Sequence, residues 1–333
     1  MAVRIGVGLG GFPFDTIDEF RTWLDVCENS EIDSIWQSDR VISRDPSLEP
    51  MTLLSIVAGA TRRLKFGTNA VVLPFRDPIT FARQCATLDH LSAGRFFPAV
   101  GIGDRDAPEW EATGRSPKGR GRRADEALEV ITRLWRAENV DFEGEYFSLR
   151  RATITPKPKQ QPLPLWLGGS SKAAIRRTAR YGSGWLAPLQ APEEAGATVQ
   201  AIRRECQRIG RPIPDDHYGA TILFRIGEGA ERPEPSRGNA ARKGAPSRGV
   251  AYSKGDASQN GDASQNGDAS SGMRERISRI RAIGDPSEVL SRIREFRRNG
   301  IMKFIAIPIA QTGEEMNQQC RLLSSEVIPY AND

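Results

Sequence analysis

The chain has 333 residues, with 47 Lys and Arg against 42 Asp and Glu, which gives a formal net charge of +5. So small an excess suits an anionic small molecule and does not require nucleic acid as a partner. No stretch approaches the run of about 20 apolar residues that crosses a membrane, and the glycine-rich opening MAVRIGVGLGG does not fit a signal peptide. The composition therefore predicts a cytoplasmic protein without a membrane or nucleic-acid partner.

The cysteines are few and far apart, and none forms a CxxC pair. They are Cys27, Cys85, Cys206 and Cys320. Disulfide frameworks and metal sites need cysteines at short, regular spacings. We therefore expect reduced, buried thiols and no metal centre.

Apolar strand patterns alternate with amphipathic helix patterns along almost the whole chain. Strands are predicted at 3–9, 33–37, 64–73, 95–100, 163–169, 184–189, 218–226 and 303–309. Helices are predicted after Asp15, at 50–59, 78–91, 124–135, 172–181 and 192–210, between Asp285 and Gly300, and at 314–327, with a hairpin at 140–149. Eight strands with helices between them favour an α/β fold of the closed (β/α)8 TIM-barrel type over two open-sheet domains.

One segment breaks the alternation. Residues 228–272 show no periodicity and few apolar side chains, and GDASQN occurs at 255–260 and again at 261–266. Such a composition favours disorder, and a barrel tolerates a long insertion as a surface loop. We therefore divide the chain into the first seven βα units (1–227), a disordered insertion (228–272) and the remainder of the barrel (273–333).

Polar residues follow several of the predicted strands, at the edge where parallel α/β folds bind their ligands. They are Asp39 and Arg40 after the second strand, Asn69 in the third, and Asp104 after the fourth. For Asp39 and Arg40, a local salt bridge is an equally good interpretation. The two histidines of the chain have no Ser, Cys or metal-ligand neighbour at a useful spacing, so hydrolytic triads and zinc chemistry are not expected.

Glycines end the first strand in a GxGxxG pattern formed by Gly6, Gly8 and Gly11. A Rossmann fingerprint needs its third glycine at the start of a helix, and here Pro13 and a loop intervene. We expect instead that these glycines let backbone and ligand approach each other at the top of the strand.

The run Gly168-Gly169-Ser170-Ser171 ends the fifth strand and opens a helix. Backbone amides at glycines, together with a helix N-terminus, suit a phosphate group. The alternative is an ordinary turn with serine as the N-cap. The turn at 182–185, which enters the sixth strand, is expected to lie beside this run.

Several longer segments occur together in a characteristic order. They are DSIWQSDR, GTNAVVLPFRDP, ATLDHLSAGRFFPAVGIGD, KGRGRRADEALEVITRLW, FEGEYFSL, PKPKQQPLPLWLGGSS and ARYGSGWL. In this combination the chain resembles the bacterial luciferase-like flavin monooxygenases and their deazaflavin-dependent relatives, over about residues 1–227 and 276–330. The resemblance implies a TIM barrel that holds FMN, or alternatively the deazaflavin coenzyme F420, at its carboxyl-terminal face.

The resemblance also implies roles for individual residues. Gly168, Gly169 and Ser170, with Gly184 and Trp185, are implied to hold the phosphate region of the cofactor.

Nearer the ring, the resemblance places Gly103 and Asp104 beside the ribityl chain. It places Asn69 and Ala70 where the family often has a strand bulge with a non-proline cis peptide. Asp39 matches an acidic residue of the family.

Arg40 departs from the family pattern, because many deazaflavin-dependent members carry histidine at this position as a proton donor. An arginine stays protonated and cannot act as a general acid. Arg40 is expected to bind an anionic substrate or to stabilise negative charge on the reduced ring, which favours FMN over F420.

The expected function is therefore that of a flavin-dependent oxidoreductase, namely a monooxygenase that uses reduced FMN and O2 on a small organic substrate. A separate flavin reductase would supply the reduced cofactor. The alternative is F420-dependent hydride transfer, in which basic residues from Arg115 to Arg123 could hold an acidic cofactor tail. Further alternatives are a non-catalytic flavin-binding protein and a scaffold. Family members often dimerise through helices, so a homodimer is expected.

Overall fold

The inner layer of the protein is a ring of parallel strands, seen in a computed structural model that describes residues 2–43, 46–227 and 275–333. In chain order these strands are β1 (Arg4–Leu9), β2 (Ser34–Gln37), β3 (Lys65–Thr68), β4 (Val71–Val72), β5 (Phe96–Phe97), β6 (Ala99–Gly101), β9 (Trp166–Gly168), β10 (Gly184–Ala187), β11 (Tyr218–Ile226) and β13 (Lys303–Pro308). Hydrogen bonds link them in the order β4-β6-β9-β10-β11-β13-β1-β2-β3-β5.

The third and fourth strands of the ring, which complete its closure, are each divided into two short strands. β3 and β4 are separated by residues 69–70, and β5 and β6 by residue 98. The lower halves pair with each other, and so do the upper halves. The two ends of the hydrogen-bonded path therefore meet, which confirms the predicted (β/α)8 barrel.

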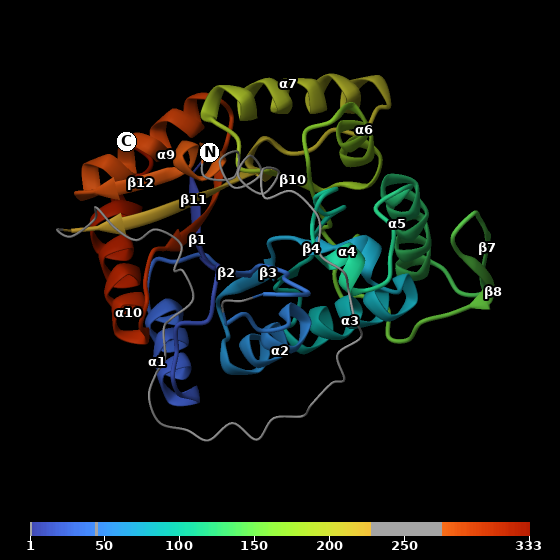
Figure 1. Ribbon diagram of the computed structural model, residues 1–333, viewed down its shortest axis with the longest axis horizontal. Helices are drawn as coiled ribbons and strands as arrows, with labels where there is room; N and C mark the ends of the chain where they lie inside the picture. Colours follow the sequence, from blue (N-terminus) through green and yellow to red (C-terminus); the bar gives the residue numbers. More distant parts are fainter. Residues whose placement is uncertain (1, 44–45, 228–274) are drawn as a thin grey trace, which may run out of the picture.

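Helices surround the ring on all sides (Figure 1). They are α1 (Ile17–Glu28), α2 (Pro50–Ala60), α3 (Pro78–Leu91), α5 (Arg120–Arg136), α6 (Lys172–Tyr181), α7 (Pro192–Arg208), α9 (Pro286–Arg298) and α10 (Gly313–Leu322). Each buries an apolar stripe against the strands, as the helical spacing of apolar residues predicts.

Capping side chains fix where several helices begin. Asp285 accepts hydrogen bonds from Ser287 N (2.8 Å) and Glu288 N (3.3 Å) at α9. At α1, Thr16 Oγ1 accepts from Glu19 N (3.2 Å), but the Glu19 carboxylate reaches Asp15 N (2.9 Å) instead of returning to Thr16. Only one of the two bonds of a capping box therefore forms there.

Side chains from neighbouring strands fill the barrel interior opposite the glycines of β1. A Cβ added at Gly6 would lie 2.2 Å from Ser34 Oγ, and one at Gly8 would lie 2.6 Å from Ile307 Cγ1. These glycines make room for other side chains rather than for a ligand, which corrects the expectation from the sequence. Trp36 and Trp166 meet edge to face in the same layer, with ring centroids 6.1 Å apart.

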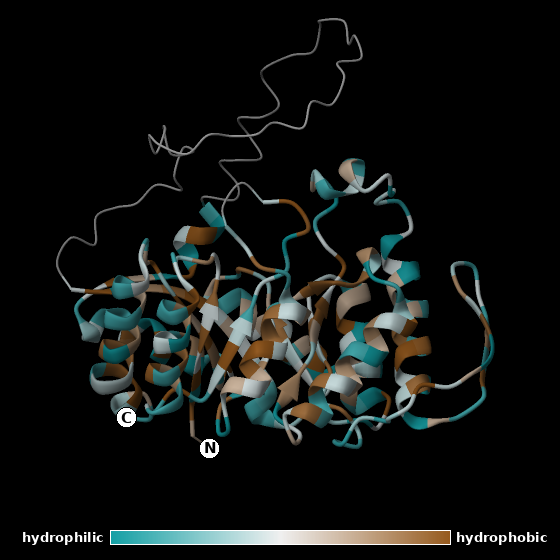
Figure 2. Cartoon of the chain, turned by 90° about the horizontal axis from the view of Figure 1, so that it is seen from below, coloured by the Kyte–Doolittle hydropathy of each residue, from teal (hydrophilic) through white to brown (hydrophobic). Residues whose placement is uncertain are grey.

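Some elements extend or change the prediction. The hairpin β7 (Val140–Glu143) and β8 (Ser148–Ala152) forms as expected and projects beyond the helix layer (Figures 1 and 2). A short strand, β12 (Arg281–Gly284), was not predicted and pairs in parallel with the second half of β11. The final helix is shorter than predicted, because a π-helical turn (Leu323–Val327) follows α10. The predicted insertion at 228–272 lies outside the described residues.

Within the described ranges, no helix combines the length and the apolar character needed to span a membrane. The four cysteines are free and buried. Among the same residues, His, Cys, Asp and Glu side chains form no group of three that could hold a metal ion.

Candidate functional site

The candidate site lies at the carboxyl end of the barrel. Figure 2 shows both chain termini on one side of the barrel and the long connecting segments rising on the opposite side. All strands of the ring are parallel, so their carboxyl ends meet on that opposite side. In TIM barrels this face carries the functional residues, whereas the amino-terminal face serves stability.

A bulge in the third strand gives the site its first polar group. The Asn69–Ala70 peptide bond is cis, as the resemblance implied. Thr68 Oγ1 accepts a hydrogen bond from Ala99 N (2.8 Å) and donates one to Ala99 O (2.6 Å), which ties the bulge to the fourth strand. Asn69 Nδ2 donates to Thr221 Oγ1 on β11 (3.0 Å), so this amide is held by a strand from another part of the ring.

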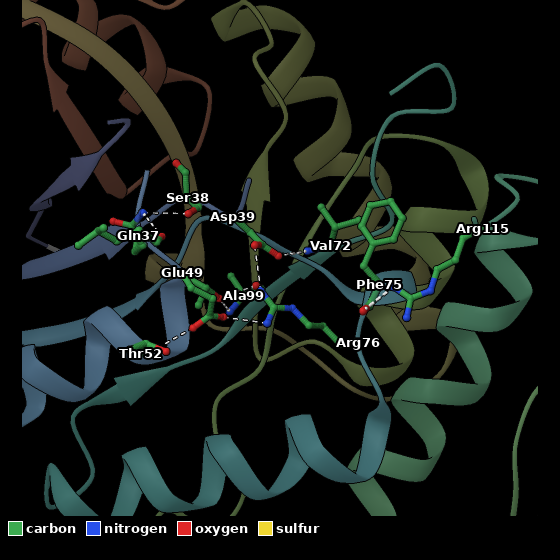
Figure 3. A network of polar contacts seen from close by, with 12 residues as sticks. Gln37, Ser38, Asp39, Glu49, Thr52, Val72, Phe75, Arg76, Ala99 and Arg115 are labelled. Carbon is green, nitrogen blue, oxygen red and sulfur yellow. Dashed lines mark hydrogen bonds and ion pairs between the residues drawn. The ribbon is translucent and has the colours of Figure 1, made fainter. Parts of the chain in front are cut away.

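Asp39 supports the same bulge from the side. Its carboxylate, only 2% exposed, accepts hydrogen bonds from Val72 N (3.1 Å) and Arg76 Nη2 (2.9 Å) (Figure 3). Arg76 also binds Glu49 (2.8 Å), whose other oxygen accepts from Thr52 N at the start of α2 (2.7 Å). Burial raises the pKa of Asp39, although Arg76 and the Val72 amide oppose the shift. Because its oxygens are engaged within the protein, Asp39 is placed to position β4.

The other two predicted catalytic residues lie apart from this network. Arg40 is exposed and forms no hydrogen bond or ion pair with another described residue. Asp104 is also exposed, and its carbonyl accepts from Trp110 Nε1 (2.7 Å) in the loop above the fourth strand. Within the described residues no contact joins the side chains of Asp39, Arg40 and Asp104, and their catalytic roles stay a prediction.

The loop after the fourth strand is fixed to the rim by aromatic contacts. Trp110, in the short helix α4 (Glu109–Ala112), packs on Phe75 with ring centroids 4.3 Å apart. Arg115 donates to Phe75 O (2.8 Å) from the same loop (Figure 3). Gly103 has φ +73°, and a Cβ there would lie 2.8 Å from Val72 Cγ1, whereas a Cβ at Gly101 would meet open space. Gly101 is thus the position where the rim of the fourth strand is clear of other side chains.

The run of glycine and serine after β9 forms an open turn at the start of α6. Ser171 is the N-cap, and its side chain accepts from Ala174 N (3.2 Å). Gly169 has φ +109°, and a Cβ there would lie 2.9 Å from Ala174 Cβ, so only glycine fits. Ser170 is exposed. The arrangement leaves backbone amides and the N-terminus of a ten-residue helix facing outward, which suits an anion.

The start of α5 contacts the neighbouring helix α6, because Arg177 of α6 joins the two helices. Its guanidinium, largely buried, donates to Asp125 Oδ1 (2.6 Å) and to Gly121 O (3.1 Å). α5 begins at Gly119 (φ +76°) with no side-chain cap. The neighbouring Arg120 is half-buried, and its Nε has no hydrogen-bond partner within the described chain. We call Gly168–Ser171 with the first turns of α5 and α6 the anion cradle.

Gly184 and Trp185 do not belong to this cradle, which corrects their expected place in it. Gly184 begins β10 and pairs with Trp166 at the start of β9, so the turn before it lies at the amino end of the strands. Its missing side chain makes room for the Trp166 ring, 2.4 Å from an added Cβ. Trp185 is fully buried in the outer core, and its Nε1 donates to Gly169 O (2.9 Å). Through this hydrogen bond Trp185 holds the backbone of the cradle in place from the buried side.

Both histidines lie away from the carboxyl end. His90 is at the last turn of α3, where Nε2 is 2.8 Å from Lys157 O. His217 precedes β11 at the amino end, with Nδ1 2.6 Å from Ser183 O. Neither can serve as a proton donor at the rim near Asn69.

Three residues of the site escaped the sequence prediction. Thr221 and Arg76 act through contacts with residues far away in the chain, which no local pattern reveals. The sequence indicated Arg120 only as one member of a basic run. The signal that could have distinguished it is an arginine at the start of a helix that has no capping side chain.

A closed parallel barrel with a bulged third strand and a glycine- and serine-rich turn after its fifth strand defines a TIM-barrel protein whose candidate site lies at its carboxyl face. Residues 2–303 match the family described as luciferase-like monooxygenase, and the chain belongs to that family.

Curated relatives are of more than one kind. An uncharacterised protein of Mycobacterium tuberculosis is 31% identical over 190 residues, which cover 57% of this chain and 65% of the relative. An F420-dependent glucose-6-phosphate dehydrogenase of Kineococcus radiotolerans is 34% identical over 169 residues, covering 48% of this chain and 49% of the relative. An F420-dependent hydroxymycolic acid dehydrogenase of M. tuberculosis is 28% identical over 253 residues, covering 69% of each chain. The matches thus span from about half to about two thirds of these relatives.

Solved structures show the same fold at low identity. The monooxygenase RslO1 from Streptomyces bottropensis superposes with a TM-score of 0.76 at 19% identity, covering 98% of this chain and 99% of that one. An F420-dependent secondary alcohol dehydrogenase, in complex with an F420-acetone adduct, gives 0.77 at 18% identity and covers all of both chains. The oxygenating constituent of 3,6-diketocamphane monooxygenase from Pseudomonas putida, in complex with FMN, gives 0.73 at 16% identity and covers 99% of each.

Proposed function

We propose that this protein is a monooxygenase that uses reduced FMN and O2 on a small organic substrate. The observation that carries the proposal is the combination of the anion cradle after β9 with the bulged third strand, two strands away across β6, at the carboxyl end of a barrel of the luciferase-like family. A cofactor phosphate in the cradle would direct the rest of the molecule over the rim of the barrel.

The residues present fit a phosphate-bearing cofactor. Gly169 leaves the turn without a side chain, Ser170 offers an exposed hydroxyl, and Arg120 has guanidinium donors without a partner among the described residues. An unpaired, half-buried guanidinium is costly unless a ligand supplies the missing acceptor. The cradle therefore has both the shape and the charge that a phosphate monoester needs.

When bound, the cofactor ring supplies the redox chemistry, and the protein positions it. In our proposal Gly168, Gly169 and Ser170 bind the phosphate, and Gly103 lies along the cofactor chain. Asn69 and Ala70 form the surface behind the ring, with the Asn69 amide fixed by Thr221. The Asp39–Arg76 pair keeps β4 and the bulge in place from outside the barrel.

Apolar groups below the rim exclude water from the reacting atoms. Ala70 and Ile307 are partly buried and pack on the layer that contains Trp36 and Trp166. Exclusion of water from this apolar layer strengthens each electrostatic interaction with a bound ligand.

Oxygen chemistry is favoured over hydride transfer by the absence of histidine from the rim. Hydride transfer to a carbonyl needs a group that delivers a proton at the same place. His90 and His217 lie at the amino end of the barrel, and Arg40 occupies the position after Asp39. In our proposal Arg40 and the exposed Asp104 contribute charged groups to the substrate side of the rim.

The second candidate is an F420-dependent dehydrogenase, and one observation favours it. Three curated relatives that align over parts of this chain at 28–34% identity are F420-dependent dehydrogenases. Basic residues of α5, including Arg120 and Arg123, would then contact an acidic cofactor tail. A barrel that stores flavin without catalysis is the remaining alternative.

We further propose that a separate reductase supplies reduced FMN and that the protein forms a homodimer through α2 and α3. Ile56 and Ile79 are exposed large apolar residues on these two helices. A groove of about 460 Å³ lies between the helices, and Ile79 is part of its lining. Size-exclusion chromatography with light scattering on Ile56→Asp should give monomers, and an unchanged mass would contradict this assembly.

Reaction with oxygen separates the candidates. The protein is mixed anaerobically with chemically reduced FMN and then with oxygenated buffer in a stopped-flow spectrometer. We expect bound FMN to be oxidised with kinetics that differ from those of free FMN and that depend on protein concentration. Identical kinetics with and without saturating protein would contradict the monooxygenase proposal, and stable retention of reduced F420 in air would support the second candidate.

A further inference from the structure

β12 adds a rim segment that the eight-stranded ring does not need. It pairs with residues 223–226 of β11, whereas β10 pairs with residues 218–220 on the same side of that strand. β13 occupies the other side of β11 through residue 224. β12 therefore continues the wall of the barrel above the point where β10 ends, at the carboxyl face that carries the candidate site.

The register decides which side chains of β12 face the site. Residues paired across parallel strands point to the same side of the sheet, and successive residues alternate. Ala282 pairs with Phe224, and both are buried in the outer core. Arg281, which pairs with Leu223, therefore lies on the inner side, the same side as Thr221. Thr221 holds Asn69 there, so Arg281 shares that side with the proposed ring surface.

Arg281 has no counter-charge among the residues that the structure describes, unlike other arginines nearby. Arg225 binds Ile309 O (2.8 Å) and faces Glu315 (3.6 Å). Arg279 forms ion pairs with Glu194 (2.9 Å) and Glu275 (2.8 Å). Arg281 is half-buried, yet within the described ranges it forms neither an ion pair nor a hydrogen bond through its side chain.

Because Arg281 has no acceptor among the described residues, its guanidinium donors are free to bind a ligand at this rim. Arginine offers five donors in a planar fork that matches oxyanions. The cradle that would hold the cofactor phosphate follows β9, whereas Arg281 is on β12, which continues the wall above β10, so the two cationic groups come from different segments of the rim.

We propose that Arg281 is a specificity-determining residue that binds an anionic oxygen group of the substrate, a carboxylate, sulfonate or phosphate. The inference rests on the proposed function in one respect, namely that the substrate lies over the rim together with the cofactor. It adds the chemical class of the substrate, because a neutral alkane or aldehyde would leave the guanidinium unpaired.

The test uses inorganic sulfate as the probe and the full-length protein saturated with oxidised FMN or F420, so that the cradle is occupied. Sulfate replaces chloride at constant ionic strength, and the absorbance and fluorescence of the bound cofactor report on binding. We expect a saturable change in the wild-type protein. Arg281→Gln should weaken sulfate binding about tenfold or more, which corresponds to about 1.4 kcal/mol, and Arg281→Lys should retain part of it. Arg279→Gln is the matched control and should bind sulfate like the wild type.

The outcomes separate this inference from the proposed function. If the wild type binds the cofactor but shows no saturable sulfate response, or if Arg281→Gln responds like the wild type, the inference is wrong. If Arg281→Gln weakens cofactor binding instead, Arg281 belongs to the cofactor site and the inference is also wrong. If neither cofactor binds, the proposed function fails, and thermal shifts of the cofactor-free variants with sulfate still test Arg281. General stabilisation by sulfate acts on all variants alike, so only a difference confined to Arg281→Gln would support the site.

Discussion

The two ends of the barrel differ in how their charged side chains are paired. At the amino end Lys303 is buried and binds both Asp33 and Ser34 Oγ (2.6 Å), and Arg4 pairs with Asp216 (3.0 Å). Burial lowers the pKa of Lys303 to about 8, although Asp33 opposes the shift. At the carboxyl end, Arg40, Arg120 and Arg281 have no carboxylate partner among the described residues.

This difference indicates that one end of the barrel serves stability and the other end serves ligand binding. Charges that are fully paired contribute to a closed end that binds nothing further, whereas unpaired charges leave hydrogen-bonding capacity for ligands. Some charges at the carboxyl end are paired as well, namely Asp39 with Arg76, which hold the bulge, and Arg225 with Glu315. Variants at the two ends should therefore separate effects on stability from effects on binding.

Asp33→Asn should have the largest effect on stability, because it leaves the buried Lys303 without a carboxylate. Removing one partner of a buried pair costs about 3–5 kcal/mol, and we expect about 3 kcal/mol since Asp33 is itself 21% exposed. Urea unfolding at neutral pH measures the loss. Asp216→Asn, which breaks a more exposed pair, is the control and should cost less than about 1 kcal/mol. Equal losses of unfolding free energy in the two variants would contradict the expectation that the buried pair contributes more to stability than the exposed pair.

Gly169→Ala should have the largest effect on cofactor binding. The residue has φ +109°, and the added Cβ would lie 2.9 Å from Ala174 Cβ, so the cradle must move. We expect cofactor affinity to fall at least about tenfold, with a stability loss of about 1–2 kcal/mol. Gly101→Ala is the comparison, since its Cβ meets open space and should leave stability unchanged. Fluorescence titration gives the affinities, and wild-type affinity in Gly169→Ala would argue against the cradle as the phosphate site.

Asp39→Asn should show a pH signature. Burial raises the pKa of Asp39 above its ordinary value of 3.8, so the native state holds more protons than the unfolded chain between 3.8 and the raised value. The contribution of this carboxyl to stability is therefore fully present below 3.8 and declines as the pH rises through that window. The variant should lose this slope and, at neutral pH, should change stability by no more than about 1 kcal/mol, because the neutral amide avoids the desolvation cost that outweighs the Arg76 contact.

Unfolding free energies measured across that pH window test the assignment. Asp104→Asn, at an exposed carboxyl, serves as the control and should keep the wild-type pH profile. An unchanged profile in Asp39→Asn would mean that another group carries the slope.

Thr221→Val should have a moderate effect that is confined to the cofactor. The valine removes the acceptor for Asn69 Nδ2 while preserving shape, so the amide loses its fixed orientation. We expect a shift in the visible spectrum of bound cofactor and an affinity loss of about three- to tenfold, in line with one hydrogen bond of about 1 kcal/mol. Thr221→Ser keeps the hydroxyl and should restore the spectrum. A serine variant as impaired as the valine variant would point to packing instead.

Arg40→Ala should have the smallest effect on stability, because the side chain is exposed and has no described partner. If Arg40 stabilises negative charge on the reduced ring, the variant should bind reduced cofactor less tightly and oxidised cofactor equally well. Anaerobic titrations in both redox states measure this ratio. Unchanged ratios together with unchanged substrate turnover would exclude both roles suggested for Arg40.

Local sequence signals predicted the ring of strands and the helices well. Capping residues such as Asp285 and Ser171, and apolar periodicity, act over a few residues and are visible in the sequence. The strand β12 was missed because RAIG is short and follows an arginine-rich segment without alternation. The π-helical turn after α10 was missed for a similar reason, since helical periodicity continues through it.

The site was predicted in part, and the remainder depends on distant contacts. The glycine and serine run after β9 is local, so its open turn could be anticipated from residues 168–171. The partners of Asp39 and Asn69 lie 37 and 152 residues away, and only the closed ring brings them together. Gly184 was misplaced because its turn enters a strand, and such turns lie at the opposite end of a parallel barrel.

The most direct test of the account is an anaerobic equilibrium titration of the purified protein with FMN and with F420, each in the oxidised and reduced states. The account predicts one bound cofactor per chain, tightest for reduced FMN, with affinity lost in Gly169→Ala and retained in Asp216→Asn. Selective binding of F420 would keep the site and replace the monooxygenase by the dehydrogenase. Failure of both cofactors to bind would contradict the assignment of a redox site to the carboxyl end of this barrel.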